Sequence, residues 1–259
     1  MRKRFRVVAM SAAAAMAFAA LLSTPALAQR PRVPTPTGPA PRLDGHPDLS
    51  GLWQRPYVPD MTKDSKNGDQ KGAGELPFTA EGLKIWKAYD PAKGDYTGSC
   101  LPFGLTRSMN SPDPIQIMQS DKYVALLYEQ NTWFKVIPIG RPHRDIDPTW
   151  FGDSVGHWEG DTLVVDTTNF NGKTRLDTIG HPHSDQLHVI ERFTRTDAGH
   201  IAYEMTVDDP KYYTHPWKNT RTFTLRPDWQ IMEYSCEENN KDFLEGHIKG
   251  GINKITESK

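Results

Sequence analysis

The segment Leu187–Asp208 has the sequence LHVIERFTRTDAGHIAYEMTVD, and it decides the fold. Apolar and polar side chains alternate on both sides of the triplet Asp197-Ala198-Gly199. A period of two is typical of a strand with one buried face, and Asp and Gly between two such runs indicate a tight turn. We therefore predict two antiparallel strands, Leu187–Arg195 and His200–Asp208.

The same alternation extends along the chain on both sides of this hairpin, with turn signals such as Glu159-Gly160-Asp161 between the runs. The further strands that it predicts are Leu49–Arg55, Ile115–Gln119, Tyr123–Glu129, Trp133–Ile139, Ser154–Trp158, Asp161–Thr168, Lys218–Arg226 and Ile231–Cys236. Short links favour antiparallel neighbours, and a closed sheet hides its edges best. The prediction is an all-β fold, an antiparallel barrel of about eight to ten strands. A β-sandwich is the alternative.

One short helix is predicted at Ala80–Tyr89, with Thr79 as its N-cap and Pro91 beyond its end. The segment 95–114 shows neither the two-residue period of a strand nor the 3.6-residue period of a helix, and it is predicted to be irregular. These elements belong to a single barrel domain over residues 46–259, preceded by a Pro-rich linker over residues 29–45.

The first 28 residues have the features of a secretory signal peptide. A basic start is followed by the apolar run Val7–Leu22 and by an A-x-A site that ends at Ala28. We expect cleavage after Ala28 and a protein of the periplasm or the extracellular medium. No later run has the length of a membrane-spanning helix. In an oxidising compartment, Cys100 and Cys236 are predicted to form a disulfide.

The net charge of the chain limits the kinds of binding partner that we expect. The first 28 residues hold four of the 31 basic side chains and none of the 32 acidic ones, so the remainder has a formal net charge of −5. A mildly acidic chain argues against nucleic acid and against an anionic membrane surface as partners. The expected partner is a small molecule, and the oligomeric state stays open.

Two kinds of motif resemble known families. Gly51-Leu52-Trp53 resembles the G-x-W opening of the lipocalin and calycin barrels. The block Gly156–Thr167 (GHWEGDTLVVDT), with His181–Ser184 and Cys236–Asn240, is similar to a group of poorly characterised secreted bacterial proteins. The first resemblance implies a barrel in which an arginine covers the tryptophan, and Arg221 is the candidate here.

Strand alternation places some polar residues on faces that are otherwise apolar. Glu191 shares a face with Val189 and Phe193, while Asn219 and Arg221 share one with Phe223. Buried charges require partners, so these residues form either a structural Glu191–Arg221 bridge or a ligand pocket. The side chains predicted to contact a substrate are Tyr203, Tyr212, Trp217, Asn219, Arg221 and Tyr234.

Histidines supply the candidate catalytic groups. His143 precedes Asp153 by ten residues, and His181 and His183 form an H-x-H pair. Two such histidines on an extended segment share a face and can reach one substrate atom or ion. The predicted catalytic residues are His143, Asp153, His181, His183 and Glu191. No cofactor is predicted; zinc or iron would need a third ligand, for which His143, His188 and Glu191 are candidates.

Three functions are compatible with this sequence. The first is an exported enzyme that uses His/carboxylate acid–base chemistry, as a lyase, isomerase or hydrolase, on a partly apolar or aromatic substrate. His181 or His183 would act with Asp153 or Glu191, and Arg221 and Tyr212 would hold a developing anion. Motifs of covalent serine catalysis and of nucleotide binding are absent. The second is a non-catalytic carrier or sensor of an apolar or haem-like ligand. The third, a structural protein of the cell envelope, predicts a filled barrel.

Overall fold

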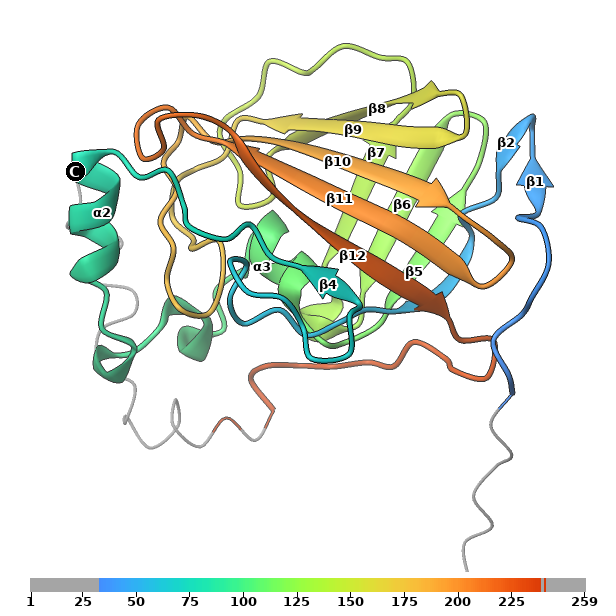
Figure 1. Cartoon of the computed structure of the whole chain (residues 1–259), viewed down its shortest axis with the longest axis horizontal. Coiled ribbons are helices and arrows are strands. Elements are labelled where there is room, and N and C mark those ends of the chain that lie inside the picture. Colours follow the sequence, from blue (N-terminus) through green and yellow to red (C-terminus); the bar gives the residue numbers. More distant parts are fainter. Residues whose placement is uncertain (1–32, 239, 241–259) are drawn as a thin grey trace, which may run out of the picture. The chain divides into compact units, whose positions relative to one another are not determined.

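A computed structural model describes residues 33–238 and 240, and in it the chain forms a nearly closed antiparallel β-barrel (Figure 1). The signal peptide predicted over residues 1–28 lies outside the described residues. The strands are β1 Arg42–Leu43, β2 His46–Pro47, β3 Gly51–Gln54, β4 Gln70–Lys71, β5 Ile115–Gln119, β6 Tyr123–Tyr128, β7 Phe134–Pro138, β8 Asp153–Glu159, β9 Thr162–Thr168, β10 His188–Arg195, β11 His200–Asp208 and β12 Trp217–Leu225. The helices are α2 Ala80–Lys87 and α3 Leu105–Asn110, with short 3-10 turns at Pro91–Lys93, Tyr96–Ser99 and Gln130–Thr132.

The main sheet has the strand order β7-β6-β5-β3-β12-β11-β10-β9-β8, and β4 pairs with β12 beside this path. The two end strands approach each other where the chain leaves β7. There the Gly140 amide donates a hydrogen bond to the Gly156 carbonyl of β8 at 2.8 Å, next to a bridge between Ile139 and Gly156. The barrel prediction is therefore confirmed, and the sandwich alternative is wrong.

The alternation that predicted the strands also sets which side chains face inward. In β10, Val189, Glu191 and Phe193 are each at most 1% exposed, while the residues between them are half-buried. The 8-residue register between β10 and β11 pairs Glu191 with Met205 and Phe193 with Tyr203. The predicted strand Ile231–Cys236 does not form, because both sides of β12 are already paired, with β11 on one side and β3 and β4 on the other.

An arginine does cover the tryptophan of the G-x-W segment, but it is not the one predicted. Trp53 is fully buried, and the guanidinium of Arg195 lies 5.1 Å from the centre of its ring. The Arg195 side chain also donates to the backbone carbonyls of Asp48 and Ala198, which fixes it at this end of the barrel. The expectation that Arg221 stacks on Trp53 is wrong.

Arg221 instead holds the buried helix α3, which lies in the segment predicted to be irregular. All six residues of α3 are buried. Arg221 donates to the Met109 carbonyl at 2.7 Å and to Asn110 Oδ1, and Arg55 donates to the Ser108 carbonyl at 2.8 Å. Two cationic side chains at its C-terminal carbonyls stabilise this six-residue helix. The proposed Glu191–Arg221 bridge does not form.

The predicted disulfide is present: Cys100 and Cys236 are bonded across 136 residues. It ties the segment that follows β12 to the turn Tyr96–Ser99. Thr79 caps α2 as predicted, because its side chain accepts a hydrogen bond from the Gly82 amide at 3.0 Å. Among the described residues, none of the helices has the length and apolar content that crossing a membrane would require.

A candidate imidazole–carboxylate site

The long connections 55–114, 169–187 and 209–216 lie at the barrel end where β3, β9 and β11 finish. We call this the loop end. Within the second connection the chain turns back on itself between Leu176 and His181, whose backbones are joined by a hydrogen bond of 2.9 Å. Gly180 permits the turn, since its φ is +86° and a Cβ there would lie 2.0 Å from the Tyr89 ring.

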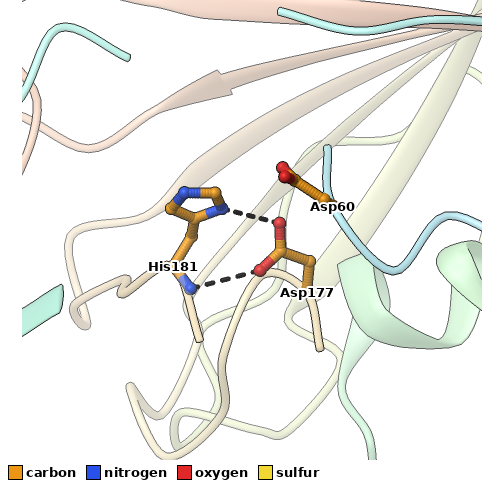
Figure 2. A group of neighbouring side chains, drawn as sticks. All are labelled: Asp60, Asp177 and His181. Atoms are coloured by element: carbon orange, nitrogen blue, oxygen red, sulfur yellow. Dashed lines mark hydrogen bonds and ion pairs between the residues drawn. The ribbon is translucent and has the colours of Figure 1, made fainter. Parts of the chain in front are cut away.

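This turn brings Asp177 and His181 together. His181 Nδ1 contacts Asp177 Oδ2 at 2.6 Å, and the His181 amide donates to Asp177 Oδ1 at 3.2 Å (Figure 2). The Met61 amide also donates to Asp177 Oδ2, at 3.0 Å. Asp177 is fully buried and His181 is 1% exposed. The carboxylate therefore fixes both the orientation of the imidazole and the tautomer with its proton on Nδ1.

The other ring nitrogen of His181, Nε2, makes no hydrogen bond within the described part of the protein. The ring lies against the Trp86 ring, with 5.0 Å between centroids, and 6.0 Å from that of Phe78. An imidazole with a carboxylate on Nδ1 and an open Nε2 has the arrangement of a general base.

Asp60 completes a group of three. One ligating atom from each of Asp60, Asp177 and His181 lies within 4.8 Å of the others, and Figure 2 shows the Asp60 carboxylate beside the pair. These are residue types that bind divalent cations. However, His181 Nδ1 and both Asp177 oxygens already take part in hydrogen bonds within the protein. A cation here would have to break the short Nδ1–Asp177 contact, so the geometry fits a proton-transfer pair better than a metal centre.

His183 follows two residues later but has no free nitrogen. Its Nε2 contacts Thr174 Oγ1 at 2.5 Å, and its Nδ1 contacts the Ser184 carbonyl at 2.9 Å. Burial lowers the pKa of His183 below its ordinary value, which favours the neutral ring. The structure thus separates the two members of the H-x-H pair: His181 is open on one side, and His183 is saturated by structural contacts.

Glu191 lies inside the barrel with partners that the sequence did not reveal. Its carboxylate forms an ion pair with Lys135 of β7, and it accepts a hydrogen bond from the Tyr203 hydroxyl at 2.9 Å. Burial is the main reason that the pKa of Tyr203 is raised well above its ordinary value, and the charge of Glu191 adds to it. Neither His181 nor His183 is in contact with this group.

His143 and Asp153, which were predicted together, do meet. His143 Nδ1 contacts Asp153 Oδ2 at 3.0 Å. Their other partners are Asp166 and Arg144, so this pair is separate from Asp177 and His181. The connection between β7 and β8, which carries His143, therefore does not contribute to the Asp177–His181 site. The 169–187 and 209–216 connections do touch, because Tyr213 donates to the Pro182 carbonyl and Asp209 accepts from Ser184.

The residues predicted to bind substrate occupy several places. Asn219 lies beside Arg221 under α3, and Tyr203 lies beside Glu191. Trp217 packs against Tyr213 at the loop end, whereas Tyr212 is half-buried against the core in the 209–216 connection, near Lys211. Tyr234 is 47% exposed.

A recess of about 370 Å³ opens at the loop end. Its wall includes Tyr57, Arg107, Asn110, Thr178 and Tyr234. Thr178 comes directly after Asp177, so the recess and the Asp177–His181 pair share one turn of the chain. A second hollow of about 340 Å³ lies beside the outer face of β10–β12, next to β4.

Sequence reasoning missed Asp177 and Asp60. The signal for Asp177 was its position four residues before His181 with Gly180 between them, a spacing that a tight turn can close. Asp60 comes from a distant segment and had no such signal. Comparison with protein-family models and with curated proteins finds no match to this chain.

Proposed function

We propose that this protein is an exported enzyme that transfers protons to and from a small, partly aromatic molecule, with His181 as the acid–base group. The observation that carries the proposal is the buried Asp177–His181 pair, in which Nδ1 is held at 2.6 Å and Nε2 has no partner among the described residues. Of the predicted catalytic histidines, His143 and His183 contact protein groups through both ring nitrogens.

In this mechanism neutral His181 accepts a proton from the substrate at Nε2. Asp177 accepts the Nδ1–H hydrogen bond throughout and stabilises the imidazolium that forms. The proton then returns from Nε2 to the product or to a leaving group. Such a cycle suits a lyase, an isomerase or a hydrolase, the classes predicted from the sequence.

The surroundings of Nε2 favour an apolar or aromatic substrate. Trp86 stacks on the imidazole, Phe78 lies tilted beside it, and Tyr213 packs on Phe78 at 5.2 Å. Helix α2 carries Trp86 and covers this side of the ring. Of the eight residues of this helix, Gly82 is the one that is buried. A substrate would therefore reach Nε2 by displacing a helix that has few interior contacts.

The test compares wild type with two histidine variants on a panel of aryl esters, hydroxy acids and enolisable ketones, followed by mass spectrometry. His181→Asn should lower the rate of any turnover by about 10²–10⁴-fold, the usual contribution of a general base. His200→Asn is the matched control, because His200 pairs with Asp197 in the same way but on the surface. If His181→Asn turns over a compound at the wild-type rate, the proposal is wrong.

A second function, a carrier without catalysis, is favoured by the recess at the loop end. Its volume suits a small molecule, and Tyr57 and Tyr234 offer aromatic surface at its edge. The carrier predicts that no compound is turned over and that ligand affinity is the same in wild type and in His181→Asn. Tyr234→Ala should then weaken binding.

We also infer a relation to the calycin barrels and a location outside the cytoplasm. The Trp53–Arg195 contact supports the first inference. The Cys100–Cys236 disulfide supports the second, because such bonds persist in oxidising compartments. Isolation of the native protein from a periplasmic or culture-medium fraction, cut after Ala28, is the direct test of export.

A further inference from the structure

A second group of histidines and carboxylates lies on the outer face of the barrel, away from the Asp177–His181 pair. Asp166 of β9 is on this face, because its neighbours Val165 and Thr167 are fully buried while its own side chain is 34% exposed. His188 begins the adjacent strand β10, and His143 comes from the connection between β7 and β8. Three separate segments thus contribute to one group.

Two imidazole nitrogens converge on a single carboxylate oxygen. His143 Nε2 lies 3.1 Å from Asp166 Oδ1, and His188 Nε2 lies 3.0 Å from the same atom. Each of the two histidine side chains is about one-third exposed, at 33% and 37%. The group is therefore open to ions from the solvent.

The orientation of the His143 ring is fixed by a contact at its other nitrogen, Nδ1. Its Nδ1 contacts Asp153 Oδ2 at 3.0 Å, and Asp153 is 1% exposed and accepts further hydrogen bonds from the amide and Nε of Arg144. Both Asp153 oxygens thus accept hydrogen bonds from Arg144, so the proton of the contact with His143 lies on Nδ1.

This arrangement demands a positive charge next to His143 Nε2. With its Nδ1 proton donated to Asp153, a neutral His143 presents a lone pair at Nε2 to an oxygen of Asp166 that is also an acceptor. Two acceptors at hydrogen-bond distance repel each other unless a proton or a metal ion lies between them. An imidazole nitrogen that faces such a point, with its other nitrogen on a carboxylate, is the usual form of a zinc-binding histidine.

We propose that His143, His188 and Asp166 bind one divalent transition-metal cation of the zinc type. Two imidazole nitrogens and one carboxylate oxygen are a ligand set that zinc accepts, and three protein ligands leave a position for solvent. Zinc bonds of about 2.0–2.1 Å place the ligand atoms of a tetrahedral site roughly 3.3 Å apart. The two imidazole nitrogens are more than 4.8 Å apart, because among the described residues only Asp60, Asp177 and His181 bring three ligand atoms within that distance of one another. The two rings must therefore move closer on binding, which their exposure and the position of His143 on a connection allow. Asp153 is a positioning residue that does not touch the metal.

The experiment measures zinc bound by the full-length protein after dialysis, and zinc affinity by calorimetry. Wild type should retain one equivalent, His143→Gln and His188→Gln should each lose it, and Asp153→Asn should bind about 10–100-fold more weakly. His200→Gln, the surface His–Asp pair, should bind like wild type. Cobalt should give the visible spectrum of a low-coordinate N/O site in wild type but not in His188→Gln.

Two results would overturn the proposal. One is retention of wild-type zinc affinity in the His143→Gln/His188→Gln double variant. The other is loss of zinc in His181→Gln with retention in His188→Gln, which would place the ion at Asp60, Asp177 and His181 instead. Because a variant could fail to fold, melting curves accompany each measurement: zinc should raise the melting temperature of wild type and of His200→Gln, but not that of His188→Gln.

Discussion

Replacement of Glu191 by Gln should strongly destabilise the barrel. The Glu191 side chain is fully buried and that of Lys135 is 3% exposed, and the two form an ion pair across the interior. The substitution keeps the shape of the side chain and leaves an amide oxygen for the Tyr203 hydroxyl, but it leaves the Lys135 ammonium without its counter-ion. Breaking a buried pair in this way costs about 3–5 kcal/mol of unfolding free energy.

The loss of unfolding free energy in Glu191→Gln should become smaller as the pH rises. Burial lowers the pKa of Lys135 in the folded protein, while the charge and hydrogen bond of Glu191 raise it. Without Glu191 the folded pKa falls further, whereas the unfolded value stays near about 10.4. Below the folded pKa both states carry the proton and the full penalty applies. As the pH rises from the folded pKa toward the unfolded one, the native lysine loses its proton and the deficit should shrink.

Urea denaturation of wild type and Glu191→Gln between about pH 6 and about pH 10 measures both effects. The matched control is Glu159→Gln, which removes the exposed Glu159–Arg192 pair and should cost less than about 1 kcal/mol. The double variant Lys135→Met/Glu191→Leu should be more stable than either Lys135→Met or Glu191→Gln. A loss below about 1 kcal/mol in Glu191→Gln, or a loss that does not change with pH, would refute the reasoning.

Three further predictions concern other parts of the fold. Replacement of Cys100 and Cys236 by Ser should lower the unfolding free energy by up to about 4–5 kcal/mol in non-reducing urea titrations, and a reductant should bring wild type to the same value. Thr79→Ala removes the cap of α2 and should cost about 1 kcal/mol in the same assay; an unchanged midpoint would contradict the cap. Because burial lowers the pKa of His183, wild-type stability should decline as the pH falls below about 6.5, where the unfolded ring takes up a proton first. His183→Gln should flatten that decline, and an equal slope in both proteins would argue against a buried neutral ring.

The sequence predicted the strands well because burial on one face imposes a period of two. Strands β5 and β11 form with the predicted bounds, and Glu191 faces inward as the alternation of Val189 and Phe193 requires. Helix α3 was not predicted, since its six residues, LTRSMN, contain a single i,i+4 apolar pair, Leu105 and Met109, which is too short a pattern to indicate a helix. It is held by Arg55 and Arg221, which lie far away along the chain, so only the tertiary structure makes it stable.

The candidate sites were less accessible from the sequence than the strands. Alternation assigned Glu191 to the interior but could not name Lys135, because partner choice depends on which strands meet across the barrel. The histidines were noticed, yet their carboxylate partners depend on turn geometry and strand register. Asp177 reaches His181 through a local turn, whereas Asp166 reaches His188 only because β9 and β10 pair in one register.

The side chains inside the barrel argue against a carrier that holds its ligand in the barrel interior. Helix α3, the two arginines at its end and the Lys135–Glu191 pair occupy the space in which a lipocalin-like carrier would hold a ligand. Their polar groups are mostly satisfied by one another: Arg221 Nε is the one atom of these side chains that is buried without a partner among the described residues. Burial and the nearby guanidinium of Arg221 also lower the pKa of Arg55 to about 10. A ligand that entered it would have to displace these contacts, so the two proposed sites are at the loop end, where His181 Nε2 has no hydrogen-bond partner among the described residues, and on the outer face, where the His143–Asp166–His188 group is partly exposed.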